Sequence, residues 1–383
     1  MFWPKPICSC SRLPQAKSGR PGGVLNAPAG DQERLSARLR CRAVKMLSLG
    51  TVLALCSSVA SGSPNSQSEQ APVSKAHAIA LLGSNLAGRV SMDYIGYDEA
   101  TDSVWVPGGN TGKTFVIDAR TEHVRSVDGF PVRVADGREL GPSSVTFGPH
   151  SAFIGNRADA TVCAVNTANL KRETCITLPS TPDGLAYVAT TQEVWATTPR
   201  THSIALLGVT DSGLKEAGRI ELDGQPEGFA VDTKRGRFFT NLEDKDETLA
   251  IDLSTHAVKA RWKTGCGSNG PRGIAIDMER GLLFVACTSA LVGFGLDAEG
   301  ARIGAAVTGE GVDNPAIVTG LKRVFAAAGT AGTLSVFEYG QDGRLSPLST
   351  VQTARGVRVV TADKLGKAFA ADSAGGRIWV LGP

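Results

Sequence analysis

Residues 225–265 read QPEGFAVDTKRGRFFTNLEDKDETLAIDLSTHAVKARWKTG, and this stretch decides the fold. It contains four short runs of apolar and β-branched residues, separated by segments rich in Gly, Asp, Lys, Ser and Thr. We expect strands at residues 229–231, 237–240, 248–252 and 257–262. Short apolar runs bounded by such turns are typical of antiparallel strands joined by tight hairpins. Four strands in about 45 residues is the size of one β-propeller blade.

The unit recurs seven times along the chain. The residue before the first strand of each unit is, in order, Tyr94, Ser144, Gly184, Gly228, Gly273, Pro315 and Gly356. The steps between these positions are 50, 40, 44, 45, 42 and 41 residues. The second strands read VWVP, AFIG, VWAT, FFTN, LFVA, VFAA and AFAA. Because each blade buries its faces against its neighbours, this period predicts an all-β, seven-bladed β-propeller of four-stranded antiparallel blades.

The ring is expected to close with a strand from the N-terminal side. The last repeat, residues 357–381, supplies only three strands, whereas an apolar run at residues 78–82 precedes the first repeat. Pairing this run with the last repeat completes a fourth strand and removes two exposed sheet edges. Residues 77–383 are therefore predicted to form one propeller domain, and we expect a monomer.

The charge of the chain is divided between a basic leader and a mildly acidic body. Residues 1–60 contain nine Lys and Arg against two acidic residues, a net charge of +7. The remaining 323 residues contain 31 basic and 35 acidic residues, a net charge of −4. A nucleic acid partner is therefore not expected, since the propeller body lacks the basic excess that such a surface needs.

The leader has the pattern of a secretory signal peptide. An apolar run at residues 46–55 follows a basic flank, and Ser58-Val59-Ala60 fits a signal-peptidase site. The run is too short for a stable membrane anchor. We expect a signal peptide at about 46–60, preceded by an over-extended start or a long basic region, and a periplasmic or secreted protein. An organelle transit peptide is the alternative. Residues 61–76 form a polar spacer predicted to be disordered.

Four of the eight cysteines lie in the body, where two disulfides are expected. Cys163 and Cys175 fall in adjacent strands of the second repeat. Cys266 lies in the loop entering the fifth repeat, and Cys287 ends that repeat's second strand, on the same face of the ring. An exported chain favours two bridges, and buried free thiols are the alternative.

Polar residues converge on one mouth of the predicted channel. Loops that enter the first strands contribute Asp93, Ser143, Asp183, Glu227, Arg272, Asp313 and Arg355. The ends of the second strands contribute Asn110, Asn156, Thr198, Asn241, Cys287, Gly329 and Asp372. A concave mouth with convergent polar groups is the default ligand site. The predicted ligand-binding residues are Asp93, Asn156, Asp183, Glu227, Asn241, Arg272, Asp313 and Arg355. The alternative is that these groups cap strand ends and satisfy one another.

The residue types expected at this mouth limit the catalytic and metal-binding roles that it could have. His123, His150 and His256 fall on the opposite face, and only His202 and His77 are expected to approach the mouth. Catalysis by a histidine is therefore disfavoured, and Glu227 is the one candidate catalytic residue. No cofactor is predicted, although Glu227 and Asn241 with a neighbouring aspartate would suit Ca²⁺. The acidic run at residues 243–247 lacks the spacing of an EF-hand loop and is expected to be solvated.

The body resembles the YncE-like, YVTN-repeat β-propellers of bacterial exported proteins. The segments that carry this resemblance are QPEG at 225–228, NLEDK at 241–245, VKARW at 258–262, RGIAID at 272–277, GTL at 332–334 and TARG at 353–356. The tetrapeptide that names the repeat does not occur intact. The resemblance covers roughly residues 77–383 and implies export and binding more than catalysis, because most members have no assigned reaction.

Two classes of function follow. The first is an exported binding or scaffold protein whose channel mouth takes a small acidic molecule, a peptide or a protein. The second is a lactonase or gluconolactonase-like hydrolase of a small sugar-acid ester, with Glu227 as the base and Arg272 or Arg355 holding the anion. The two classes are distinguished by a lactone hydrolysis screen and a metal measurement.

Overall fold

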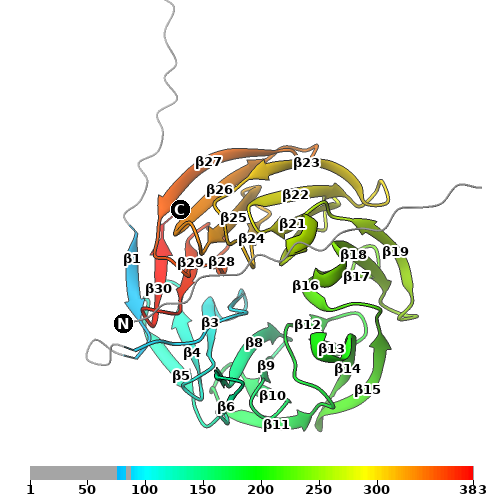
Figure 1. The fold of residues 1–383 in the computed structure, drawn as a ribbon. Coiled ribbons are helices and arrows are strands. Elements are labelled where there is room, and N and C mark those ends of the chain that lie inside the picture. The colour runs from blue at the N-terminus through cyan, green and yellow to red at the C-terminus, as the bar shows by residue number, and fades with distance from the viewer. Residues whose placement is uncertain (1–75, 83–87, 383) are drawn as a thin grey trace, which may run out of the picture. The chain divides into compact units, whose positions relative to one another are not determined.

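The computed structural model describes residues 76–82 and 88–382 of the chain. Seven antiparallel sheets of four strands each stand side by side around a ring (Figure 1). This arrangement confirms the predicted seven-bladed β-propeller. Apart from Ala76, the expected signal peptide and spacer lie outside the described residues, so export remains a prediction.

Blades 1 to 3 occupy the first half of the ring. Blade 1 consists of β2 (Gly96–Asp98), β3 (Ser103–Gly108), β4 (Lys113–Asp118) and β5 (Val124–Val127). Blade 2 consists of β8 (Pro142–Phe147), β9 (Ser151–Asn156), β10 (Thr161–Asn166) and β11 (Arg172–Thr177). Blade 3 consists of β12 (Leu185–Val188), β13 (Glu193–Thr198), β14 (Ser203–Thr210) and β15 (Gly213–Glu221).

Blades 4 to 7 complete the ring. Blade 4 consists of β16 (Pro226–Asp232), β17 (Arg237–Leu242), β18 (Glu247–Asp252) and β19 (Val258–Lys263). Blade 5 consists of β20 (Ile274–Asp277), β21 (Leu282–Cys287), β22 (Ala290–Gly295) and β23 (Ala301–Val307). Blade 6 consists of β24 (Ala316–Val318), β25 (Arg323–Ala328), β26 (Thr333–Tyr339) and β27 (Leu345–Gln352). Blade 7 consists of β28 (Val360–Ala362), β29 (Ala368–Asp372), β30 (Arg377–Leu381) and β1 (His77–Ala80).

The closing strand β1 joins the two ends of the described chain. It pairs antiparallel with β30, and the register runs from His77 opposite Val380 to Ala80 opposite Arg377. Ile79 and Leu81 are buried in the core, whereas Ala78 and Ala80 are exposed. The strand begins one residue earlier and ends two residues earlier than predicted. The N-terminal strand thus completes blade 7, as the sequence indicated.

The core consists of clusters that lie between successive blades. In β17, Phe238 packs toward blade 3 with Trp195, and the next residue, Phe239, packs toward blade 5 with Phe294. The alternation of side chains along a strand therefore places apolar residues on both faces of the sheet. This explains why the second strands read as continuous apolar runs.

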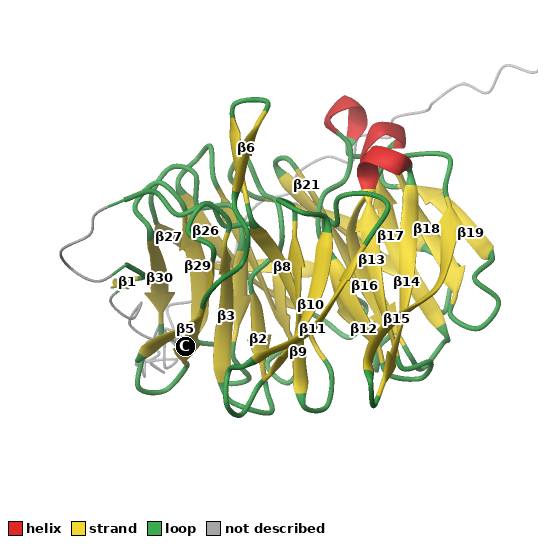
Figure 2. Ribbon diagram, turned by 90° about the horizontal axis from the view of Figure 1, so that it is seen from below, coloured by secondary structure: helices red, strands yellow, loops and turns green. Residues whose placement is uncertain are grey.

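One element of the ring was not predicted. Between blades 1 and 2 the chain forms the hairpin of β6 (Arg133–Ala135) and β7 (Arg138–Leu140), a separate two-stranded sheet. This insertion accounts for the 50-residue step between the first two repeats. Figure 2 shows the hairpin projecting on the same side of the ring as the three short 3₁₀ turns. These are η1 (Pro199–Thr201), η2 (Glu243–Lys245) and η3 (Gly267–Asn269).

Both expected cysteine pairs lie at disulfide distance. Cys163 faces Cys175 across the β10–β11 pair with an S–S distance of 2.05 Å. Cys266 in the loop before η3 reaches Cys287 at the end of β21, with an S–S distance of 1.97 Å. Both pairs therefore suit an oxidising compartment.

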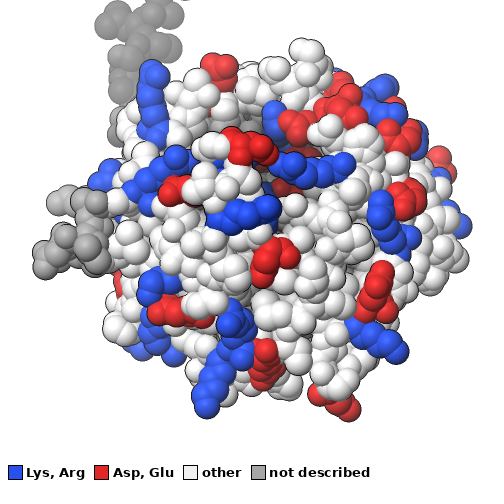
Figure 3. Space-filling view, turned by 60° about the horizontal axis from the view of Figure 1, so that its bottom comes forward, with Lys and Arg blue, Asp and Glu red and all other residues white. Residues whose placement is uncertain are grey.

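Within residues 76–82 and 88–382, no helix has the length and apolar character needed to cross a bilayer. Acidic and basic side chains are interspersed over the face of the propeller in view in Figure 3. That face carries no broad area of positive charge of the kind that binds nucleic acid.

Candidate functional site

The first strands of neighbouring blades approach one another closely around the channel. A Cβ atom added to Gly228 would lie 2.3 Å from the carbonyl oxygen of Arg272, and one added to Gly273 would lie 2.5 Å from Asn314 Oδ1. At these two positions glycine is needed because no side chain fits. The close approach brings together the charged residues that precede each glycine.

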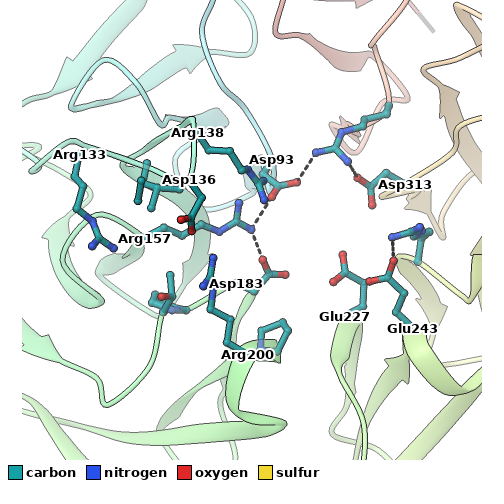
Figure 4. Close-up of a pocket in the computed structure, with 17 residues that line it drawn as sticks. Asp93, Arg133, Asp136, Arg138, Arg157, Asp183, Arg200, Glu227, Glu243 and Asp313 are labelled. Carbon is teal, nitrogen blue, oxygen red and sulfur yellow. Dashed lines mark hydrogen bonds and ion pairs between the residues drawn. The ribbon is translucent and has the colours of Figure 1, made fainter. Parts of the chain in front are cut away.

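These residues line a cavity of about 580 Å³ at the mouth of the channel. Five of the eight predicted ligand-binding residues belong to its lining: Asp93, Asp183, Glu227, Arg272 and Asp313. Figure 4 shows the side chains of Asp93, Asp183, Glu227 and Asp313 converging from different blades of the ring. The hairpin and η1 add further residues to the wall, so the cavity is deeper than the ring alone would make it.

Two arginines that the sequence did not single out neutralise most of the aspartates. Arg157 donates to Asp93 at 2.7 Å and also pairs with Asp183. Arg358 pairs with Asp313 at 2.5 Å and with Asp93 at 3.4 Å. Burial opposes the positive charge of Arg157, yet Asp93 and Asp183 hold its pKa above the ordinary value. The side chains of Arg157, Asp93 and Asp183 are all less than one-fifth exposed. Removing one of these partners would therefore leave a largely buried charge without compensation.

A further ion pair lies on the other side of the cavity. Arg272 pairs with Glu243, which is the first residue of η2 and follows the end of β17. Glu243 belongs to the acidic run that was expected to be solvated, and its side chain is 30 % exposed. The predicted anion-binding arginine of this blade is therefore already paired with a carboxylate.

Glu227 differs from the other acids of the cavity because it has no cationic partner. Among the described residues, no hydrogen bond or ion pair reaches its carboxyl group. Burial and the negative charges of Asp183, Asp313, Asp93 and Glu243 raise its pKa to about 9. Glu227 is therefore protonated at neutral pH and presents an uncharged carboxyl group to the cavity.

The neighbouring acids respond to the same environment. Burial raises the pKa of Asp313 to about 6 although Arg358 opposes the shift. Burial also raises the pKa of Asp183 against the effect of Arg157. The pKa of the Tyr94 hydroxyl is raised by burial and then by Glu227, Asp183 and the other acids. Burial and mutual repulsion therefore make Asp183, Glu227 and Asp313 harder to ionise than ordinary carboxyl groups.

The opposite wall carries cations that are not paired. Arg133 and Arg138 of the hairpin and Arg200 of η1 line the cavity. Within the described chain, none of their guanidinium groups has a hydrogen bond or an ion pair. In Figure 4 these arginines lie to the left of the view, whereas Glu227 and Asp313 lie to the right. Asp136 at the hairpin tip is also unpartnered and reduces the positive charge of this wall.

Three of the predicted ligand-binding residues lie outside the cavity lining. The carboxamide of Asn156 donates to Pro131 O and accepts from Ala158 N. That of Asn241 donates to Arg272 O and accepts from Thr248 Oγ1. Both amides therefore brace backbone at strand ends, which is the alternative that the sequence left open. Arg355 is exposed on the rim. The strand β28 begins at Val360 rather than at residue 357, so Arg358 takes the position expected for Arg355.

The two histidines expected near the mouth do not line this cavity. His77 Nε2 lies 2.6 Å from Glu122 in the turn between β4 and β5, on the opposite face. His202 ends η1 with its side chain exposed. His256 packs edge-on against Trp195, with ring centroids 5.4 Å apart. Histidine chemistry is therefore absent from the described lining of the mouth.

Neither a metal site nor a general base is favoured by this arrangement. Within the described residues, no group of three or more His, Cys, Asp and Glu is arranged to hold a metal ion. Asn241, the expected oxygen ligand beside Glu227, is engaged with backbone. Glu227 itself holds its proton at neutral pH, which disfavours a role as a base. The arrangement is suited to binding charged groups.

An aromatic pair joins two blades of the ring close to the charged cavity. Tyr94 precedes β2 of blade 1, Phe229 belongs to β16 of blade 4, and their rings stack with centroids 5.7 Å apart. A second cavity of about 310 Å³ lies on the other side of this pair. Its lining contains no charged side chain and combines apolar residues such as Phe147 and Ile317 with polar ones such as Thr146 and Asn314. The two ends of the channel therefore have different chemical character.

Comparisons with known proteins support the fold alone. No protein-family model and no curated protein matches the chain. A propeller chain of the mitotic checkpoint complex is 12 % identical, with a TM-score of 0.66, over 87 % of this chain and 99 % of that one. A chain of hydrazine synthase from Kuenenia stuttgartiensis is 14 % identical, with a TM-score of 0.63, over 78 % of this chain and 97 % of that one. Virginiamycin B lyase from Staphylococcus aureus is 12 % identical, with a TM-score of 0.62, over 81 % of this chain and 99 % of that one.

Proposed function

We propose that this protein is an exported, YncE-like binding propeller that takes a small acidic molecule or a peptide at the charged mouth. The observation that carries the proposal is the set of unpaired arginines, Arg133, Arg138 and Arg200, on the wall of the cavity. The other arginines of the cavity are held by carboxylates, so these three are available to an anionic group. Guanidinium groups bind carboxylates through paired, charge-assisted hydrogen bonds. No cofactor is part of this proposal.

A hydrolase of sugar-acid esters is the weaker candidate. It requires an ionised Glu227 as the base and a free arginine to hold the substrate anion. Burial raises the pKa of Glu227 to about 9, and Arg272 is paired with Glu243. Both features favour binding over this reaction.

Replacing the arginines of the hairpin tests the binding proposal. We expect Arg133→Ala and Arg138→Ala each to weaken the binding of adipate, citrate or triglycine about tenfold, since each removes a charged hydrogen-bond donor. Isothermal titration calorimetry at low ionic strength measures the dissociation constants. A variant that carries both substitutions serves as a further comparison. Adding salt should weaken the binding of these probes to the native protein more than to this double variant.

Two control variants separate this effect from general disturbance. Val134→Ser changes an exposed residue of the same hairpin that does not line the cavity. Arg344→Ala removes an exposed arginine of blade 6 that pairs with Asp342. Both should bind the three probes as the native protein does. If the arginine variants also retain full affinity, or if no probe binds the native protein, the mouth is not an anion-binding site.

Export is tested on the mature protein. We expect removal of residues 1–60 during secretion, because the basic flank, the apolar run and Ser58-Val59-Ala60 form a signal-peptide pattern. N-terminal sequencing of material from the periplasm or medium should begin near Ser61. An intact leader on protein recovered from the cytosol would contradict this prediction.

A further inference from the structure

The groups of the mouth that lack partners differ between the two sides of the cavity. Three arginines of the cavity are engaged in ion pairs with four acids. The arginines are Arg157, Arg272 and Arg358, and the acids are Asp93, Asp183, Asp313 and Glu243. Three guanidinium groups and the carboxylate of Asp136 remain on the side of the hairpin and η1, with a net charge of about +2, and the carboxyl group of Glu227 remains on the other side. A ligand that satisfies both sides carries a negative charge at one end and a hydrogen-bonding or positive group at the other.

The surroundings of Glu227 decide what that second group is. The acids that act on it are Asp183, Asp313, Asp93 and Glu243, and Tyr94 and Arg358 also interact with it. These four acids are paired with only three arginines, Arg157, Arg272 and Arg358, so one negative charge is left in excess. An arriving carboxylate would meet this negative field, whereas an ammonium group would be attracted by it. The field therefore favours a cation beside Glu227.

Resting on the proposed function, we infer that the mouth takes a zwitterion, an amino acid or a short peptide. Its ammonium group lies at Glu227, and its carboxylate lies among Arg133, Arg138 and Arg200. Binding of this kind changes the protonation state of Glu227. The free protein holds a proton on Glu227 at neutral pH, because burial raises the pKa of that group to about 9. An ammonium ion beside the carboxyl group favours its ionised form, so the proton passes to the buffer as the ligand binds.

Three probes with the same carbon chain and different ends test the inference. ε-Aminocaproate is the zwitterion, adipate carries two carboxylates, and hexamethylenediamine carries two ammonium groups. We expect ε-aminocaproate to bind the native protein about tenfold more tightly than either of the others, since only it satisfies both walls. A series from diglycine to tetraglycine covers other spacings between the charged ends. Calorimetry in two buffers of different ionisation enthalpy at neutral pH reports protons released by each probe.

Glu227→Gln identifies the group that meets the ammonium ion. This variant should abolish proton release and weaken ε-aminocaproate about tenfold, while adipate binds as tightly as before. The matched control is Glu310→Gln, which changes an exposed carboxylate in the loop between β23 and β24 that does not line the cavity. This control should leave affinity and proton release unchanged for every probe.

The outcomes separate this inference from the proposed function. If adipate binds at least as tightly as every zwitterion and releases no proton, the zwitterion is wrong and the anion site stands. The inference also fails if Glu227→Gln leaves the affinity and proton release of ε-aminocaproate intact. If no anion or zwitterion binds at all, the proposed function itself fails.

Discussion

Replacement of Ile79 and Leu81 by aspartate is expected to lower the free energy of unfolding by about 5 kcal/mol or more. Both side chains are buried in the core cluster shared by blades 7 and 1. Burying each apolar side chain contributes about 1.5–3 kcal/mol, and an unpaired carboxylate placed there adds a further cost. A change of this size approaches the whole stability of many proteins. The melting temperature should fall by about 10 °C or more.

The same strand provides the control. Ala78→Asp and Ala80→Asp place identical charges on the exposed face of β1, where no core is disturbed. The melting temperature of this variant should stay within a few degrees of the native value. Deleting residues 77–82 should reproduce the effect of the buried pair, because it also removes the ladder to β30. If all three variants melted within a few degrees of the native protein, β1 would not be the strand that closes the ring.

Arg157→Met is expected to destabilise the protein by about 2–4 kcal/mol above neutral pH, and by much less in acid. The substitution leaves Asp93 and Asp183 in a largely buried site without their shared cation. Burial already raises the pKa of Asp183 above its ordinary value. A carboxyl group with a raised folded-state pKa costs stability as the pH rises through that pKa. The penalty should therefore grow between mildly acidic and mildly alkaline pH.

Chemical denaturation of native protein and variant over that pH range measures the difference. Asp183→Asn in the Arg157→Met background should restore part of the loss, since it removes one of the stranded charges. Arg344→Met is the control, because its exposed pair with Asp342 contributes at most about 1 kcal/mol at any pH. A penalty for Arg157→Met that does not change with pH would contradict this assignment of the ion pairs.

The repeated strands could be predicted because their signal is local. Phe238 and Phe239 are adjacent, face different blades and stand at the same place in a unit that recurs. The closing strand was also predictable, because the last repeat lacked a partner. The hairpin of β6 and β7 was missed because Val132 and Val134 are exposed, so its sequence carries no buried pattern.

The candidate site could be predicted only in part. Asp93, Asp183 and Glu227 were found because they stand just before the first strands that the sequence predicted. Arg358 was missed because the start of β28 was placed three residues too early. Arg157 and Glu243 follow the ends of second strands, and the charge at those positions was a signal that could have identified them. The pairing itself depends on contacts between blades, which no single repeat encodes.

The stack of Tyr94 on Phe229 joins blade 1 to blade 4, and both residues line the 310 Å³ cavity. That cavity and the charged cavity share no lining residue. The two faces of the propeller can therefore be altered separately: a substitution in the lining of one cavity removes no wall residue of the other.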